Sequence, residues 1–169
     1  AMTFLGSTFS WNELNRMADR VADGLQRQGI RKGDRVALML PNSPYYPAYY
    51  YGVLKAGGVV LNLNPVYPEE EILHHIKDSD AKLLVTHDQN ILSKDPKQPN
   101  VMMFDKAEAV KKALAADGKR LDLVICPFTA PMSGVTRFAY TNIVGRKNMV
   151  GPERTSKHLM HGDIINNEG

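Results

Sequence analysis

The feature that most constrains the fold is a pair of short apolar runs joined by a helical segment between residues 31 and 65. Residues 36–40 are continuously apolar, which favours a strand that is covered on both faces in a parallel sheet. The intervening segment is predicted to be helical, and Gly57-Gly58 would end it. Residues 59–63 form the second apolar run. We therefore predict a βαβ unit with two buried, parallel strands and a right-handed crossover.

The break after the first of these strands supplies the only local candidates for ligand contact. Asn42 and Ser43 lie between two prolines, where a strand ends and a helix begins. Ligands of open α/β sheets usually bind at this carboxyl edge, so we name both as candidate substrate-binding residues. Helix capping is the competing interpretation, because Ser43 suits an N-cap and Pro44 suits the first helical position.

The flanking segments extend the same alternation of helix and strand. Ser10 and Glu13 have the spacing of a capping box, and Trp11 opens the apolar stripe of the helix that follows. Val135 and Phe138 are expected to point inward from a later helix. Further helices are expected at 68–78, 106–116, 131–143 and 158–167, strands at 82–86 and 121–126, and a surface loop at 87–100. The fold class is α/β: three layers, with a mostly parallel twisted sheet of four or five strands and helices on both faces.

The helix between the two apolar runs is unusually rich in tyrosine. Five of its residues in a stretch of seven are Tyr45, Tyr46, Tyr49, Tyr50 and Tyr51. We interpret this band as packing rather than as a ligand platform, because buried aromatic rings usually belong to a core or an interface. A helix this apolar is expected to be covered by another part of a larger protein. Left uncovered, such a surface would favour self-association.

No motif in the sequence supplies catalysis or a metal site. Glycine-rich phosphate loops, Cys-x-x-Cys and His-Glu-x-x-His are all missing. Cys126 ends a predicted strand and is interpreted as a packed residue rather than a nucleophile. The adjacent His74 and His75 cannot share one helix face, which argues against a zinc pair. We therefore name no catalytic, cofactor-binding or metal-binding residue.

Composition narrows the class of protein further. The net charge of +3 comes from scattered basic residues, so no nucleic-acid partner is expected. The single cysteine excludes an internal disulfide and favours a reducing, cytoplasmic compartment. No apolar run approaches the ~20 residues of a membrane-spanning helix. Peripheral membrane contact is kept open for a larger parent protein, although no basic amphipathic helix argues for it.

Four phrases of the sequence, in order and separated by the expected elements, resemble one family. They are Gly33-Asp34-Arg35-Val36-Ala37, Leu40-Pro41-Asn42-Ser43, Leu54-Lys55-Ala56-Gly57-Gly58 and Asn62-Leu63-Asn64-Pro65. The chain resembles the N-terminal region of the adenylate-forming acyl-CoA synthetases, and most of all the long-chain fatty-acid–CoA ligases. The resemblance covers nearly the whole chain, best from Thr8 to Thr86 and weakly after Phe128.

The resemblance implies that residues 1–169 are the leading α/β subdomain of a larger AMP-forming ligase, truncated before its phosphate loop. Such ligases convert ATP and a fatty acid into an acyl-adenylate and pyrophosphate, and coenzyme A then displaces AMP. The family's Ser/Thr/Gly-rich loop, Tyr-Gly-x-Thr-Glu motif, ribose-binding aspartate and C-terminal lysine do not occur here. ATP, magnesium, coenzyme A and the fatty acid are therefore expected to act through the rest of the parent, and the chain alone should be inactive.

Three alternatives stay open from the sequence. The parent could be an aryl-acid–CoA ligase or a peptide-synthetase adenylation domain, since the acyl pocket of the family is mostly built downstream. The chain could also be a free-standing, non-catalytic α/β binding module.

Overall fold

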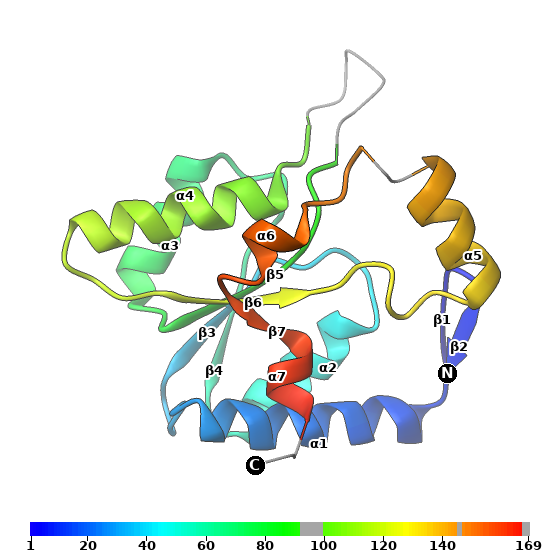
Figure 1. Ribbon diagram of the computed structural model, residues 1–169. Coiled ribbons are helices and arrows are strands. Elements are labelled where there is room, and N and C mark those ends of the chain that lie inside the picture. Colours follow the sequence, from blue (N-terminus) through cyan, green and yellow to red (C-terminus); the bar gives the residue numbers. More distant parts are fainter. Residues whose placement is uncertain (92–99, 145–146, 167–169) are drawn as a thin grey trace.

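The computed structural model describes residues 1–91, 100–144 and 147–166. A five-stranded sheet forms its centre, with the strand order β4-β3-β5-β6-β7 (Figure 1). Every neighbouring pair of these strands is parallel. The strands are β3 (Arg35–Leu38), β4 (Val59–Asn62), β5 (Leu83–His87), β6 (Asp122–Cys126) and β7 (Leu159–Met160). The predicted α/β class and the parallel β3-α2-β4 unit are confirmed.

Helices cover both faces of the sheet and enclose two separate apolar cores. One core lies under α1 (Trp11–Arg27), α2 (Tyr45–Lys55) and α7 (His161–Ile165). The other lies under α3 (Glu69–Ser79) and α4 (Met103–Ala116). Alternate residues of each strand contribute to opposite cores, as a strand buried on both faces requires. The three-layer prediction is therefore correct.

Smaller elements complete the chain beside the sheet. An N-terminal hairpin of β1 (Met2–Phe4) and β2 (Ser7–Phe9) lies next to α5 (Gly134–Ala139), which continues into a short π-helix, η1 (Tyr140–Val144) (Figure 1). A Cβ at Gly6 in the hairpin turn would meet the Ser133 hydroxyl at 2.9 Å, which shows how closely the two elements pack. The short helix α6 (Pro152–Thr155) precedes β7.

The start of α1 follows directly from local sequence. The Ser10 hydroxyl accepts from the Glu13 backbone N–H at 3.2 Å, and the Glu13 carboxylate accepts from the Ser10 N–H at 2.7 Å. This is the predicted capping box, which satisfies two backbone donors at the helix end. Gly24 and Gly52 then let α1 approach its neighbours: a Cβ at Gly24 would lie 1.9 Å from the Ile164 carbonyl oxygen.

Several sequence-based boundaries and orientations were wrong. The predicted buried run at 59–63 begins as an edge strand, with Val59 48% exposed, because β4 has β3 as its only partner among the described strands. Residues 87–89, predicted to open a surface loop, are buried at the end of β5; residues 92–99 of that loop lie outside the described part. The α4 helix begins at Met103, three residues before the predicted start.

The peripheral segments also differ from the prediction. Val135 and Phe138 are 84% and 68% exposed rather than inward-facing, since α5 lies beyond the sheet and has no core beneath it. Trp11 is 70% exposed at the first position of α1. The last predicted helix divides into β7 and α7.

Candidate functional site at the carboxyl edge of the sheet

The carboxyl ends of β3, β5 and β6 meet in one cluster of buried polar and aromatic side chains. The segment after β3 contributes Ser43, Tyr45 and Tyr49, while His87 ends β5 and Cys126 ends β6. The first residue of α7, His161, closes the cluster from the opposite end of the chain. All six side chains are at most 8% exposed. The cluster therefore joins four elements far apart in sequence at the edge where open α/β sheets bind ligands.

The Ser43–His87 contact has a defined hydrogen-bond direction. Nδ1 of His87 lies 2.8 Å from the Cys126 carbonyl oxygen, and Nε2 lies 3.3 Å from the Ser43 hydroxyl. A carbonyl oxygen can only accept, so Nδ1 carries the proton. Burial lowers the pKa of His87 to about 4, although the bond to Cys126 opposes this shift. Nε2 of the neutral ring therefore accepts the hydrogen bond that Ser43 donates.

A serine beside a neutral histidine resembles the nucleophile and base of a hydrolase, but this pair cannot act as one. Both side chains are completely buried. The orienting group on His87 is a backbone carbonyl, whereas a catalytic triad uses a carboxylate to stabilise the imidazolium that forms. The pair instead fastens the segment after β3 to the end of β5.

The aromatic residues of α2 make the second layer of the cluster. The Tyr45 hydroxyl donates to the Pro127 carbonyl at 3.0 Å, and the Tyr49 hydroxyl lies 3.0 Å from Nδ1 of His161. The rings of Tyr45 and His161 make an edge-to-face contact at 4.7 Å, a favourable aromatic geometry. Burial lowers the pKa of His161 to about 4. The packing interpretation of the tyrosine band holds for its buried members.

Cys126 belongs to the same packed layer. Its side chain is completely buried, and burial raises the pKa of its thiol well above the ordinary value. A reactive cysteine needs a lowered pKa and access to solvent. The interpretation of Cys126 as a packed residue is confirmed.

The two candidate residues from the sequence have different environments. Asn42 is exposed at this edge, whereas Ser43 is buried against His87. The capping interpretation of Ser43 is wrong, because Pro44 is the N-cap of α2 and no side chain caps that helix. The Ser43 hydroxyl is committed to His87 instead. Contact of either residue with substrate stays a prediction.

Sequence reasoning missed the polar residues that follow β5. Asp88 is 8% exposed, and its carboxylate accepts a hydrogen bond from the Phe128 N–H at 2.8 Å. Burial raises the pKa of Asp88, and the bond from Phe128 opposes that shift. Gln89 is completely buried and accepts from the Tyr140 hydroxyl at 2.9 Å. Their position immediately after an apolar strand, at the carboxyl edge, is the signal that could have found them.

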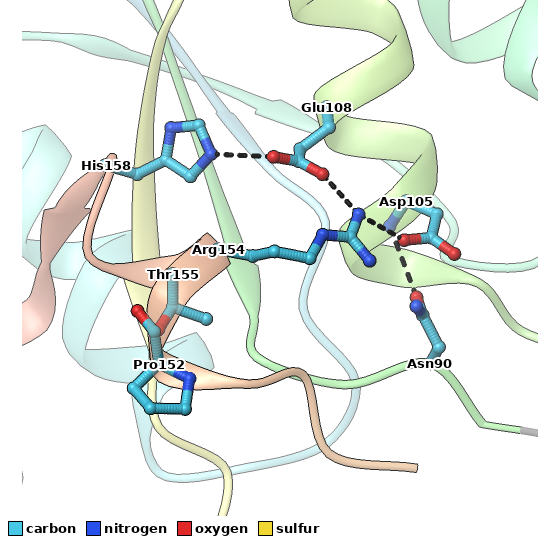
Figure 2. A network of polar contacts seen from close by, with 7 residues as sticks. All are labelled: Asn90, Asp105, Glu108, Pro152, Arg154, Thr155 and His158. Atoms are coloured by element: carbon cyan, nitrogen blue, oxygen red, sulfur yellow. Dashed lines mark hydrogen bonds and ion pairs between the residues drawn. The ribbon is translucent and has the colours of Figure 1, made fainter.

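A charged network lies on the other face of the sheet, between α6 and α4 (Figure 2). The Arg154 guanidinium pairs with Asp105 at 2.7 Å and with Glu108. Nε2 of His158 lies 3.3 Å from the other Glu108 oxygen. Arg154 also stands 4.9 Å from the centre of the Phe104 ring, a cation–π distance. The carboxylates are therefore already occupied by protein cations.

Among the described residues there is no preformed cluster of metal ligands, and the glycine pair after α2 forms no phosphate site. In the described part of the chain no group of three or more His, Cys, Asp or Glu side chains could hold a metal. Gly57, at φ +85°, ends α2 rather than opening a helix, so it presents no helix N-terminus to a phosphate. Tyr45, the first residue of α2, is buried, and its ring packs against His87 and His161.

The family model described as "AMP-binding enzyme" matches residues 1–138. The chain belongs to the AMP-binding enzyme family.

Two curated relatives each match about half of this chain. The chain is 41% identical over 88 residues to a long-chain-fatty-acid–CoA ligase of Bacillus subtilis. The matched region covers 52% of this chain and 16% of that protein. It is 45% identical over 80 residues to a plipastatin synthase of the same species, covering 47% of this chain and 3% of that protein. Each match thus spans only a small part of the relative's length.

A solved structure supports the fold over almost the whole chain. The apo structure of Mycobacterium smegmatis MbtA superposes with a TM-score of 0.61 at 21% identity, covering 95% of this chain and 22% of that chain.

Among the described residues no helix is long and apolar enough to cross a membrane.

Proposed function

We propose that residues 1–169 are the leading α/β subdomain of a long-chain fatty-acid–CoA ligase. The observation that carries the proposal is the similarity to the Bacillus subtilis ligase over 88 residues, 41% of which are identical. The site is compatible with this role, because the side chains of Ser43, His87 and Cys126 are buried at the carboxyl edge while Asn42 is exposed there.

The proposed parent joins a fatty acid to coenzyme A in two steps. The carboxylate attacks ATP to give an acyl-adenylate and pyrophosphate, and the thiol of coenzyme A then displaces AMP. Magnesium is the metal we assign to the parent, where it would neutralise phosphate charge. The role of this chain is to hold the carboxyl edge rigid. Asn42 is the accessible polar side chain through which the edge would contact substrate, while Ser43 positions the segment that carries it.

A second candidate is an adenylation domain of a peptide synthetase, which the match to the plipastatin synthase favours. An aryl-acid–CoA ligase and a non-catalytic binding module are further candidates. The carboxylic acid that is activated distinguishes the three enzyme candidates. A fatty-acid–CoA ligase, an adenylation domain and an aryl-acid–CoA ligase would each support ATP–pyrophosphate exchange with a different acid.

A hybrid enzyme tests the proposal. This chain would replace the matching N-terminal region of the Bacillus subtilis ligase, and ATP–pyrophosphate exchange would be measured with palmitate, an aryl acid and amino acids. We expect exchange with palmitate by the hybrid and no exchange by the 169-residue chain alone. Exchange by the chain alone, or a folded hybrid that activates none of the acids, would contradict the proposal.

The Asn42 assignment has its own test in the same hybrid. Asn42→Ala should raise KM or lower kcat, whereas Gln26→Ala, which removes an exposed amide near the C-terminal end of α1 and away from the carboxyl edge, serves as the control. Equal kinetics for the two variants would remove Asn42 from the site.

We further propose a cytoplasmic location with peripheral membrane contact of the parent, in keeping with a fatty-acid substrate. Co-sedimentation of the active hybrid with phospholipid vesicles tests the membrane contact. Recovery of all of the protein in the supernatant would count against it.

A further inference from the structure

The outer edge of the sheet at β4 is open. Among the described residues, β4 pairs with β3 and has no strand on its other side. The N–H of Val59 donates to the Asp34 carbonyl at 2.8 Å, and the N–H of Leu63 donates to the Leu38 carbonyl at 3.0 Å. Because backbone direction alternates along a strand in a parallel pair, Val60 and Asn62 direct their N–H and C=O groups toward the open side.

The edge also lacks the features by which proteins usually block strand pairing. Charged side chains and proline are the common protections of an exposed edge. No Asp, Glu, Lys, Arg or His occurs between Ala56 and Pro68, and no proline occurs within β4. Two copies of this strand would therefore meet without any like charges opposite one another.

The outer surface of α2 continues this uncharged edge. The Tyr46 hydroxyl donates to the Asn62 side chain at 3.0 Å, and the rings of Tyr46 and Tyr50 stack at 6.1 Å. Leu54, on the same helix, is 47% exposed. The half-buried members of the tyrosine band thus extend the apolar surface beside β4, so a strand added there would be flanked by aromatic side chains.

We propose that a second copy of this chain pairs with β4 in antiparallel fashion across a two-fold axis. The outward groups of Val60 and Asn62 allow a register centred on Leu61, which we choose because it pairs the whole stretch from residue 59 to residue 63. Val60 of one copy would exchange hydrogen bonds with Asn62 of the other, and the two Leu61 residues would face each other on the axis. This register is self-complementary, as a two-fold interface requires, and it uses every residue from 59 to 63. The result is one continuous sheet running through both copies, a form of β-strand addition.

Sedimentation velocity of the 169-residue chain over a range of concentrations tests the proposal. We expect the mass to rise from the 18.8 kDa of one chain toward twice that value. Val60→Pro removes a free N–H from the edge, where proline is tolerated, and should sediment as a monomer while keeping the circular dichroism spectrum of the folded chain. Val135→Lys is the matched control, because it removes an exposed apolar side chain from α5, away from the sheet. A monomer at all concentrations, a dimer that survives Val60→Pro, or dissociation by Val135→Lys would overturn the proposal.

Cysteine cross-linking tests the register independently of Val60→Pro. In the proposed dimer the two copies of residue 61 form a directly opposed pair with Cα atoms ~4.5 Å apart, within the range that a disulfide spans. Leu61→Cys should give a disulfide-linked dimer under mild oxidation. Val59→Cys should not, because residue 59 would face residue 63 of the other copy. The buried Cys126 contributes no accessible thiol. Cross-linking of Val59→Cys but not Leu61→Cys, or of neither, would overturn the register.

Discussion

The C-terminal segment, residues 147–165, is attached to the two faces of the sheet by different chemistry. On one face, α7 is held mainly by buried uncharged groups, with His161 against Tyr49 and Tyr45. On the other face, α6 is held by charges, with Arg154 between Asp105 and Glu108 (Figure 2). Both attachments fasten the same stretch of chain, so they can be compared directly.

The difference lies in what each attachment responds to. A buried neutral histidine is stable only while it stays unprotonated, so the α7 attachment should depend on pH. The Arg154 side chain is 41% exposed, and solvent-exposed ion pairs contribute little and are screened by salt. We therefore expect the α7 attachment to be the stronger one. The free energies of unfolding of all variants should be measured at one low protein concentration, because self-association would raise them.

The largest expected effect is the pH dependence of the α7 face. The pKa values of His87 and His161 are both lowered to about 4 in the folded protein, below the ~6.5 of an unfolded chain. The unfolded state therefore takes up protons first, and stability falls as pH drops below ~6.5. Each histidine should cost ~2 kcal/mol between about pH 7 and pH 5. Asp88 acts in the opposite direction, because its raised pKa lets the folded state take up a proton first.

Urea unfolding at several pH values measures this dependence. His87→Gln with His161→Gln keeps a donor and an acceptor at each position but removes the titration. The double variant should lose most of the slope between about pH 7 and pH 5. An unchanged slope would mean that the two histidines are not the groups responsible.

The close approach of α1 and α7 gives the next largest effect. A Cβ at Gly24 would lie 1.9 Å from the Ile164 carbonyl oxygen, so Gly24→Ala should displace α7 and cost ~2–3 kcal/mol, as overpacking does. Gly134→Ala in α5 is the control, since nothing lies within 4 Å of its Cβ position. Thermal unfolding compares the two. Equal stabilities would show that α7 is attached more loosely than its contacts indicate.

The Ser43–His87 bond should contribute less. Ser43→Ala leaves the buried Nε2 of His87 without a donor, which should cost ~1–2 kcal/mol. Asn42→Ala, on the exposed neighbour, should change stability by less than ~0.5 kcal/mol. Chemical denaturation distinguishes them. A loss at Asn42 as large as that at Ser43 would contradict the division between an accessible residue and a positioning residue.

The smallest effect is expected at the charged attachment. Arg154→Gln removes the ion pairs to Asp105 and Glu108 and the contact with Phe104, which should cost ~1 kcal/mol. High salt should reduce the difference from the parent chain. Arg120→Gln is the control, because Arg120 is 85% exposed beside Asp122. A loss larger than that of Gly24→Ala would reverse the ranking of the two attachments.

The candidate site was predictable only in its location. The strand-to-helix break at residues 41–44 identified the carboxyl edge, and Asn42 is exposed there. The partner of Ser43 was not predictable, because His87 lies 44 positions later and reaches it only through the pairing of β3 with β5. Asp88 and Gln89 were taken for a loop, since polar sequence at a strand end is the same whether or not other elements cover it.

The sequence by itself determined the elements and their order, because hydrophobic periodicity, capping and helix termination act over a few residues. The capping box at Ser10, the βαβ unit and the packed Cys126 all follow from such local signals. Only the tertiary structure decided which strand lies at the edge, which polar groups are paired and which apolar side chains stay exposed. Val59 and Phe138 illustrate this, because burial depends on what a distant part of the chain places over a residue.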